Sequence, residues 1–362
     1  MKIGKVSLDS PFVVAPMAGM TDTAFRRLVK RHGGCGLVVT EMVSSEGLVR
    51  GIDRTLEYAE YTEAERPVSI QIFGGDPVKM ADAAQIVEGM GADIVDVNMG
   101  CPVPKIAKHH AGCSLMREPA HAAAVIGAMV KAVRIPVTVK MRAGWNDQSR
   151  NAPELARMVQ DAGASAIAVH GRTAEQSYTG VADWDLVARI AESLAIPVFG
   201  SGDCVEAAQI VERMERGVSG VLVGRGVLRN PWILSQAATL AAGQIPEPVS
   251  LDVRGRFLLE YIDLLLQERV NEAEGFRHVA PGTEATAADS GAPRQARGRE
   301  RWVINKLRAL CSWYSKGLDG GAALRVSINS AGSIAELRTI VQEFFLIAPS
   351  DVATDELLSS RR

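Results

Sequence analysis

The sequence lacks the long apolar runs of a membrane protein and the cysteine pattern of a disulfide-rich or zinc-binding protein. No run approaches the roughly 20 residues that a membrane-spanning helix needs, and no apolar signal-peptide core follows Met1. The five cysteines are widely spaced without a Cys-x-x-Cys pair: Cys35, Cys101, Cys113, Cys204 and Cys311. We therefore expect reduced thiols in a cytoplasmic protein that binds neither a membrane nor a metal.

The sequence also lacks an excess of charge of either sign. Lysine and arginine number 40 against 42 aspartates and glutamates, which gives a formal net charge of −2. A chain that is basic throughout is thus excluded, and any nucleic-acid surface has to be a local patch. With 362 residues, 47% of them hydrophobic, the chain is long enough for one large domain or for a large and a small one.

Apolar runs typical of buried strands alternate with amphipathic segments up to about residue 230. There are eight runs, at residues 12–15, 37–40, 68–72, 94–97, 137–140, 166–169, 197–200 and 220–223. Helical patterns separate them, for example at residues 77–90 and 153–162. Eight such units predict an α/β protein with a (β/α)8 TIM barrel. A doubly wound open sheet is the alternative, but the glycine-rich loop that often follows its first strand is missing.

The pattern changes after Pro231, where the alternation gives way to helical periodicity. Residues 251–273 predict one helix, and helical periodicity returns at Trp302. Residues 275–298 are rich in Ala, Gly, Pro, Thr and Ser, a composition typical of a flexible insertion. We therefore predict a catalytic barrel over residues 1–245, followed by a small C-terminal helical domain over residues 246–362 that contains the insertion.

The most informative stretch is Asn98-Met99-Gly100-Cys101-Pro102, which ends the fourth apolar run. Gly100 and Pro102 break the strand there and place Cys101 in a loop just past its C-terminal end. A (β/α)8 barrel carries its chemistry at these strand ends, so Cys101 is a candidate catalytic residue. Taken alone, the stretch is equally consistent with an ordinary cysteine of a reduced protein.

Glycines and cations at other strand ends predict a site for a phosphate-bearing ligand. Gly202, Gly224 and Arg225 follow the last two strands, where barrels commonly bind phosphate, although plain tight turns would also explain the glycines. Lys140 needs an anionic or electron-rich partner, because burying an unpaired ammonium is costly. His170 is either a ligand contact or a satisfied core histidine.

Amide and apolar side chains at the same strand ends suit a heteroaromatic ring. Gln71 and Asn98 offer paired donors and acceptors, and Met17 and Ala18 offer an apolar floor. A phosphate tail together with such a ring fits flavin mononucleotide (FMN) best.

Four motifs together resemble the tRNA-dihydrouridine synthases, most closely the bacterial B-type (NifR3-like) branch. They are residues 16–22 (PMAGMTD), 98–102 (NMGCP), 140–142 (KMR) and 170–173 (HGRT). Residues 313–317, followed by Leu324-Arg325, resemble the helical domain of that branch, so the resemblance covers essentially the whole chain. It implies a flavin-dependent enzyme that reduces a uridine in folded tRNA to 5,6-dihydrouridine, with NADPH as the hydride source.

The resemblance also implies residue roles. FMN in its reduced form would pass a hydride from N5 to C6 of the uracil, Cys101 would deliver a proton to C5, and Asn98 and Arg142 would contact the substrate. Ser201 stands where the family usually has asparagine, so we expect only a weak contact from it. The implied FMN contacts are Pro16, Met17, Ala18, Gln71, Lys140, His170, Ser201, Gly202, Asp203, Gly224 and Arg225.

A local basic patch fits an RNA substrate. Between Arg294 and Arg325 there are eight basic residues against two acidic ones, which predicts a tRNA-binding surface unless it is simply a solvated helix face. The expected tRNA contacts are Lys306, Arg308, Lys316 and Arg325. We expect a monomer.

Two other functions stay open at this point. One is an FMN-dependent oxidoreductase of a small pyrimidine-like substrate, similar to dihydroorotate dehydrogenases, which would not need the basic patch. The other is a barrel without flavin that binds RNA or a partner as a non-catalytic module.

Overall fold

The computed structural model describes residues 1–107, 110–267 and 292–347. In this part of the chain there are two compact units. The first runs from Met1 to Pro246, and the second comprises residues 247–267 and 292–347. Among the described residues, no helix is both long and apolar enough to cross a membrane.

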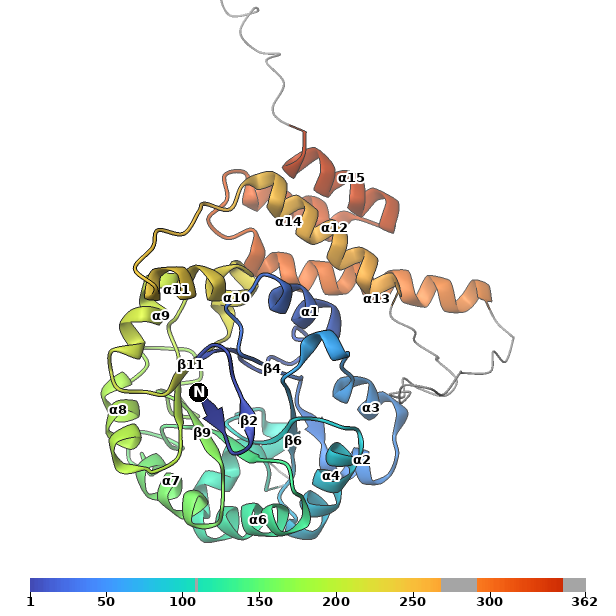
Figure 1. Ribbon diagram of the computed structural model, residues 1–362. Coiled ribbons are helices and arrows are strands. Elements are labelled where there is room, and N and C mark those ends of the chain that lie inside the picture. The colour runs from blue at the N-terminus through green and yellow to red at the C-terminus, as the bar shows by residue number, and fades with distance from the viewer. Residues whose placement is uncertain (108–109, 268–291, 348–362) are drawn as a thin grey trace, which may run out of the picture. The chain divides into compact units, whose positions relative to one another are not determined.

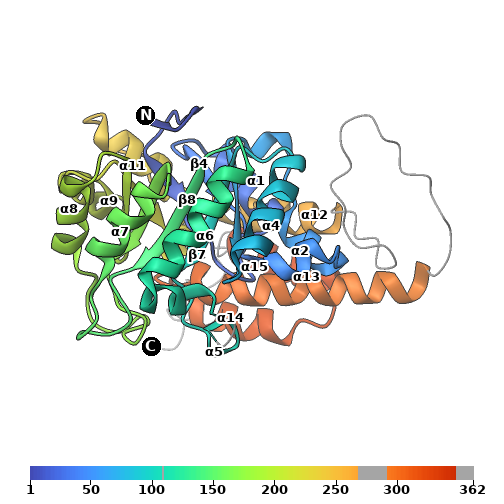
Figure 2. The ribbon, with the colours of Figure 1, turned by 90° about the horizontal axis from the view of Figure 1, so that it is seen from below.

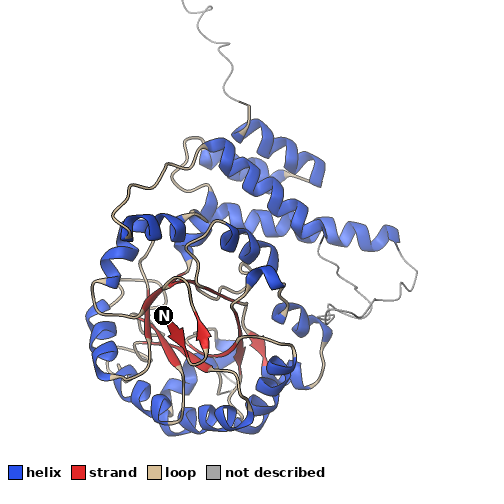
Figure 3. Ribbon diagram, in the orientation of Figure 1, coloured by secondary structure: helices blue, strands red, loops and turns tan. Residues whose placement is uncertain are grey.

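The first unit is a closed barrel of eight parallel strands, seen down its axis in Figure 1 and as the red ring of Figure 3. Each strand pairs in parallel with its neighbours, and pairings β11–β3 and β4–β6 close the ring. All eight apolar runs are strands, which confirms the predicted TIM barrel. They are β3 (Phe12–Val14), β4 (Leu37–Val39), β6 (Val68–Phe73), β7 (Ile94–Met99), β8 (Val137–Arg142), β9 (Ala166–His170), β10 (Val198–Ser201) and β11 (Gly220–Val223).

Helices cover the outside of the barrel. The predicted helical patterns at 77–90 and 153–162 form α4 (Pro77–Gly89) and α7 (Ala152–Asp161). In Figure 2 the helices stand along the strands, and α7 contacts β8 and β9. The other long helices of this layer are α1 (Thr23–Arg31), α6 (Pro119–Ala132), α8 (Trp184–Ser193), α9 (Ala207–Met214) and α11 (Ile233–Ala241).

Aspartates begin three of these helices. The side chains of Asp22, Asp76 and Asp183 each accept a hydrogen bond from a backbone N–H in the first turn of α1, α4 and α8. Such a cap satisfies a donor that the helix itself cannot pair. The strand-to-helix junctions are thus fixed by local chemistry at the rim of the barrel.

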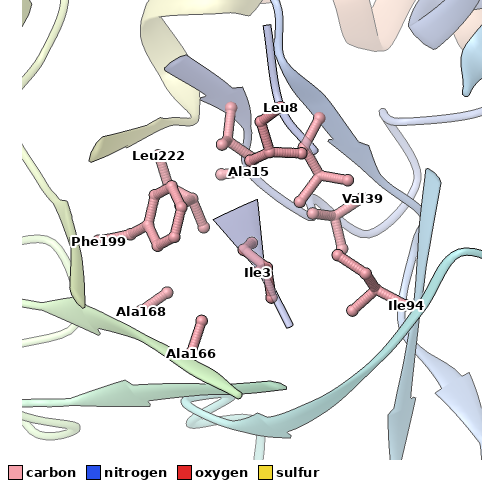
Figure 4. Close-up of a cluster of buried hydrophobic side chains, with 11 residues drawn as sticks. Ile3, Leu8, Ala15, Val39, Ile94, Ala166, Ala168, Phe199 and Leu222 are labelled. Atoms are coloured by element: carbon pink, nitrogen blue, oxygen red, sulfur yellow. The ribbon is translucent and has the colours of Figure 1, made fainter. Parts of the chain in front are cut away.

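The N-terminal hairpin fills the barrel interior at the end where the strands begin. Strands β1 (Lys2–Ile3) and β2 (Val6–Ser7) pair antiparallel, and Ile3 is only 2% exposed. In Figure 4 Ile3 lies among side chains from the first halves of several barrel strands, including Ile94 and Ala166. Since this end is packed with apolar side chains, the C-terminal strand ends are the part of the barrel left for a polar site.

Short elements shape the loops at the C-terminal strand ends. They are β5 (Val43–Ser44), α2 (Ser45–Val49), α3 (Asp53–Ala59), η1 (Glu63–Glu65), α5 (Pro104–Ala107), η2 (Gly112–Arg117) and α10 (Arg225–Arg229). A buried ion pair between Arg26 Nε and Glu65 Oε2 (2.6 Å) joins α1 to η1. Arg26 also donates to the carbonyls of Thr21 and Glu60, so its charge is fully engaged.

The second unit consists of α12 (Leu251–Gln267), α13 (Ala292–Tyr314), α14 (Gly321–Ser330) and α15 (Ile334–Phe345). Its centre is Tyr314, whose ring stacks on Phe257 (centroids 5.6 Å apart) and meets the edge of Phe345. The Tyr314 hydroxyl donates to the carbonyl of Arg254 (2.9 Å), which satisfies the one polar atom of this buried ring. Burial raises the pKa of Tyr314 well above its ordinary value.

The predicted insertion at 275–298 differs from the structure at its C-terminal end. Residues 275–291 lie outside the described residues, but α13 begins at Ala292, so residues 292–298 are helical instead of forming a loop. This stretch contains Gln, Ala and Arg, which are good helix formers, and it continues directly into the amphipathic part of α13. The Ala and Pro content that indicated a loop was therefore misleading there.

Candidate active site

A cavity that opens to solvent lies at the C-terminal strand ends of the barrel, with about 600 Å³ of empty space when the open solvent at its mouth is included. Its walls come from the loop after β3, from β8 and β9, and from the loops after β9, β10 and β11. The lining residues are Ala15, Pro16, Met17, Lys140, His170, Tyr178, Ser201, Gly202, Asp203, Cys204, Val205, Leu222, Gly224 and Arg225.

Most of the predicted cofactor contacts meet in this cavity. Pro16, Met17, Lys140, His170, Ser201, Gly202, Asp203, Gly224 and Arg225 all line it. Two do not. Ala18 is exposed on the loop after β3, and Gln71 is buried in β6 with 1% exposure. Among the described residues, no three His, Cys, Asp or Glu side chains gather as a metal site.

The loop after β10 is held in an unusual backbone conformation. Gly202 has φ +121°, where a Cβ atom would lie 2.6 Å from Ala182 Cβ, so the position admits only glycine. Asp203 follows with φ +55°, in the left-handed region that side chains rarely adopt. Both Asp203 carboxylate oxygens accept from Arg172 Nη2 (2.7 and 2.9 Å), and Oδ2 also accepts from the N–H of Ala182. These bonds hold the strained turn in place.

Cations surround the cavity. The Lys140 side chain projects from β8, and it has no ion pair with any described residue. Burial and the neighbouring Arg142 lower the pKa of Lys140 to about 8. Burial and four cations, Lys140, Arg142, Arg172 and Arg225, lower the pKa of His170 to about 2, so this imidazole is neutral. The site is thus electropositive, with Asp203 as the acidic group on its wall.

Tyr178 lies over the rim of the cavity on the loop after β9. Its ring is 59% exposed, and the guanidinium carbons of Arg225 and Arg142 lie 4.7 and 5.8 Å from its centroid. An exposed ring beside two guanidinium groups is a surface on which a planar ligand can stack. Sequence reasoning missed Tyr178, and its only sign was a single aromatic residue in an otherwise polar loop.

A buried chain of hydrogen bonds runs beneath the cavity across β6, β7 and β8. Thr138 Oγ1 donates to Asp96 Oδ1 (2.6 Å), and Gln71 Nε2 donates to Asp96 Oδ2 (2.6 Å). Asn98 Nδ2 donates to Gln71 Oε1 (2.7 Å). Asn98 Oδ1 then accepts from the backbone N–H groups of Gly100 (3.1 Å) and Cys101 (2.9 Å). The side-chain amides of Asn98 and Gln71 therefore form hydrogen bonds within the protein.

Cys101 lies at the end of this chain of bonds. Its side chain is half-buried, and burial raises the pKa of its thiol despite the nearby charges of Arg142 and Lys140. The Cys101 carbonyl accepts from the N–H of Cys113 (3.1 Å). Gly112 packs so closely that a Cβ there would lie 2.8 Å from the Cys101 carbonyl oxygen. The loop is thus fixed on both sides, with its thiol protonated near neutral pH.

Arg142 has contacts that sequence reasoning did not foresee. It is only 3% exposed, Nε donates to the carbonyl of Gly100 (2.7 Å), and Nη1 donates to those of Thr173 and Ser177 (2.9 Å each). Its guanidinium therefore joins the Cys101 loop to the loop after β9. An arginine with its donors so engaged orders backbone more than it reads a base.

The predicted tRNA contacts of the helical unit differ in their surroundings. Lys316 is exposed, with Nζ 3.8 Å from the Trp313 ring centroid, and Lys306 Nζ lies 5.4 Å from the Trp302 centroid. Arg308 instead donates to the Ala331 carbonyl (3.0 Å), and Arg325 donates to Ser315 Oγ (2.8 Å). The two lysines therefore lie against tryptophan rings, whereas the two arginines donate hydrogen bonds to other segments of the unit.

Comparison with known proteins agrees with this geometry. A family model described as dihydrouridine synthase (Dus) matches residues 13–330. The chain is 35% identical over 348 residues to a "Probable tRNA-dihydrouridine synthase" of Rickettsia bellii, which covers 95% of this chain and 98% of that protein. It is 40% identical over 269 residues to "tRNA-dihydrouridine synthase B" of Xanthomonas axonopodis pv. citri, covering 73% and 80%. Since the family model spans the barrel and the helical unit through α14, the chain belongs to the dihydrouridine synthase family.

Proposed function

We propose that this protein reduces a uridine of tRNA to 5,6-dihydrouridine, with FMN bound in the barrel cavity and NADPH as the reductant. One observation carries the proposal: an electropositive cavity at the strand ends, walled by Lys140, lies in the same barrel mouth as a cysteine whose thiol stays protonated. The family names of the relatives support the same reaction. Their match across the helical unit disfavours a small-molecule reductase, which would not need that unit.

The residues of the cavity fit the phosphate end of FMN. At Gly224 a Cβ would point towards Met17 Sδ (3.5 Å) and Ala15 Cβ (3.9 Å), two residues of the cavity wall, so a larger side chain would occupy ligand space. Arg225 comes next, with a side chain that is 33% exposed beside the cavity. Backbone N–H groups and a guanidinium together are the usual means of holding a phosphate.

The residues also fit the ring end of the cofactor. Lys140 needs an anionic or electron-rich partner, which an isoalloxazine ring with its carbonyl oxygens supplies. The neutral His170 adds a hydrogen-bonding group without adding another positive charge. Ser201 is 8% exposed and presents a hydroxyl at the same wall.

Cys101 is the proposed proton donor of the reaction. When bound, FMN supplies the hydride for C6 of the uracil, and NADPH is the source of the hydride that the flavin carries. The Cys101 thiol donates its proton to C5 of the uracil. Burial keeps the thiol in the protonated form that this step requires. The side chains of Asn98 and Arg142 form hydrogen bonds with the backbone of the Cys101 loop. We therefore propose that these two residues act on the substrate indirectly, by holding this loop in position.

The target base has to leave its stack to reach the barrel, as for other enzymes that act on a base within folded nucleic acid. We propose that Lys306, Arg308, Lys316 and Arg325 of the helical unit contact tRNA phosphates. We expect Lys316, whose side chain is exposed, to carry most of this affinity.

The proposal is tested by nucleoside analysis of tRNA from cells with and without the gene, mapped by position. Loss of dihydrouridine at defined positions, restored by the intact gene but not by a Cys101→Ala copy, is the expected result. Unchanged dihydrouridine at every position would contradict it. Flavin absorbance of the purified protein, with release of FMN on denaturation, tests the cofactor independently.

A further inference from the structure

The aspartate beneath the cavity has no role in the reaction described so far. Asp96 lies in the middle of β7, is 6% exposed, and has no ion pair with any described residue. Burial raises the pKa of Asp96, whereas the hydrogen bonds from Gln71 and Thr138 and the nearby charge of Lys140 act in the opposite direction and favour the ionised form. Its neighbours in the ladder are Gln71 on β6 and Thr138 on β8, which lie directly opposite it. Both donate to it, one to each oxygen.

The carboxylate sets the direction of every hydrogen bond that follows. An ionised carboxylate only accepts, so Gln71 has to turn its NH2 group towards Asp96 and its oxygen towards Asn98. Asn98 then turns its NH2 group towards Gln71, which leaves Oδ1 facing the strand-end loop. That oxygen accepts the two N–H groups of Gly100 and Cys101.

The reverse orientation brings like groups together. With Gln71 turned over, its oxygen would face a carboxylate oxygen at 2.6 Å with no proton between them. With Asn98 turned over, its NH2 group would face two backbone N–H donors at 2.9 and 3.1 Å. Unmade bonds of this kind at buried positions are expensive. Amide orientation follows from the partners, and here the carboxylate at one end and the two backbone N–H groups at the other favour the same orientation.

We infer that Asp96 is a positioning residue for Cys101, acting through the amides of Gln71 and Asn98 without touching the thiol. The inference deepens the proposed function and rests on it, since a fixed Cys101 loop matters most if the thiol delivers a proton to the substrate. Geometry of this kind affects rate strongly, because small displacements of a reacting group slow a reaction even when binding is retained.

The decisive variant is Asp96→Asn, which is nearly the same size but replaces one carboxylate oxygen with an NH2 group. When this NH2 group faces Gln71, Gln71 and Asn98 can turn over and release the loop. We expect kcat for uridine reduction to fall about tenfold, with KM for tRNA and Kd for FMN changed by less than about twofold. We expect alkylation of Cys101 by iodoacetamide, followed on its peptide by mass spectrometry, to speed up about fivefold.

Thr138→Val is the matched control. It removes the other hydrogen bond to the same carboxylate, yet leaves the carboxylate and the direction of the amide chain unchanged. We expect its kcat and its Cys101 alkylation rate to stay within about twofold of the parent protein. The other four cysteines are buried in both variants and serve as internal references for alkylation. Melting temperatures of both variants exclude a general loss of fold.

Three results would overturn the inference. Asp96→Asn with parental kcat and alkylation rate would show that the carboxylate positions nothing. Equal losses in Thr138→Val would reduce Asp96 to a packing role. Loss of FMN affinity with unchanged Cys101 alkylation would mean that Asp96 acts on Lys140, whose charge it also influences. The alkylation readout does not depend on Cys101 being the acid, so it stays valid even if Cys101→Ala proves fully active and the proposed function fails.

Discussion

The two units both gather cations, but they hold them in opposite ways. In the barrel, Arg142 and Arg172 are 3% and 2% exposed, and their donors are taken up by backbone carbonyls and by Asp203. In the helical unit, Lys316 is exposed and lies over the Trp313 ring, and Lys306 lies near that of Trp302. The first arrangement fixes each charge by hydrogen bonds to the protein, whereas the second places each ammonium near an aromatic ring.

This difference suits two kinds of ligand. Cations held at fixed positions in a low-dielectric cavity wall bind an anionic group at one position more strongly than at any other. Exposed lysines attract many phosphates of a polyanion, with an affinity that falls as salt rises. We therefore expect variants in the barrel to affect flavin binding, chemistry and stability, and variants in the helical unit to affect tRNA affinity alone.

The largest expected effect is in the barrel, and it tests whether the chemistry resides there. Cys101→Ala should lower dihydrouridine formation at least about a hundredfold, because the proton donor is lost. The purified variant should keep its flavin absorbance and its tRNA Kd, as the side chain does not line the barrel cavity where we propose that FMN binds. A colourless variant would place Cys101 in cofactor binding, and a fully active one would remove it from the mechanism.

The second effect tests how firmly the barrel cations are fixed. Asp203→Ala leaves the buried Arg172 guanidinium without its carboxylate, so the free energy of unfolding should fall by about 2 kcal/mol. Urea unfolding of the flavin-free protein measures this change. Asp185→Ala breaks the exposed pair with Arg216 and should cost less than about 0.5 kcal/mol. Equal losses would mean that the barrel pair is no more than another surface pair.

The third effect tests the helical unit. Lys306→Gln with Lys316→Gln should raise the tRNA Kd about tenfold at moderate salt and make its salt dependence shallower. Oxidation of NADPH by the flavin should not change. Lys2→Gln with Lys5→Gln removes the same charge from exposed positions within the N-terminal hairpin and should leave tRNA binding nearly unaltered. If both double variants bind equally poorly, total charge, and not the helical unit, sets the affinity.

The last effect is the pH dependence that comes from Lys140, which is the smallest of the expected effects on ligand binding. Its pKa in the folded protein is about 8, below the ordinary 10.5. Between these values the unfolded chain holds a proton that the folded chain lacks, so this group makes flavin-free protein more stable as pH rises from 8 to 10.5. FMN affinity should change in the opposite direction, falling a few-fold above pH 8 as the ammonium loses its charge. Both trends should disappear in Lys140→Met when urea unfolding and flavin titration are repeated.

The sequence predicted the fold more completely than it predicted the site. The eight apolar runs predicted the barrel, and glycines or cations at the strand ends identified most of the cavity wall, including Lys140, His170 and Gly224. Both are local signals, because a buried strand needs apolar side chains and a barrel carries its polar groups where strands end. The helical start at Ala292 was missed because composition outweighed helix propensity.

What the sequence alone determined was which residues reach the mouth of the barrel. Only the tertiary structure decided what each does there. Asn98 and Arg142 hold a loop, Arg172 pairs with Asp203, and Tyr178 lies over the cavity. These relations depend on register between neighbouring strands and on the conformation of separate loops. A pairing such as that of Asp96 with Gln71 joins residues 25 positions apart. The periodicity of one strand does not determine how that strand aligns with its neighbour. Such contacts therefore form only when the barrel closes.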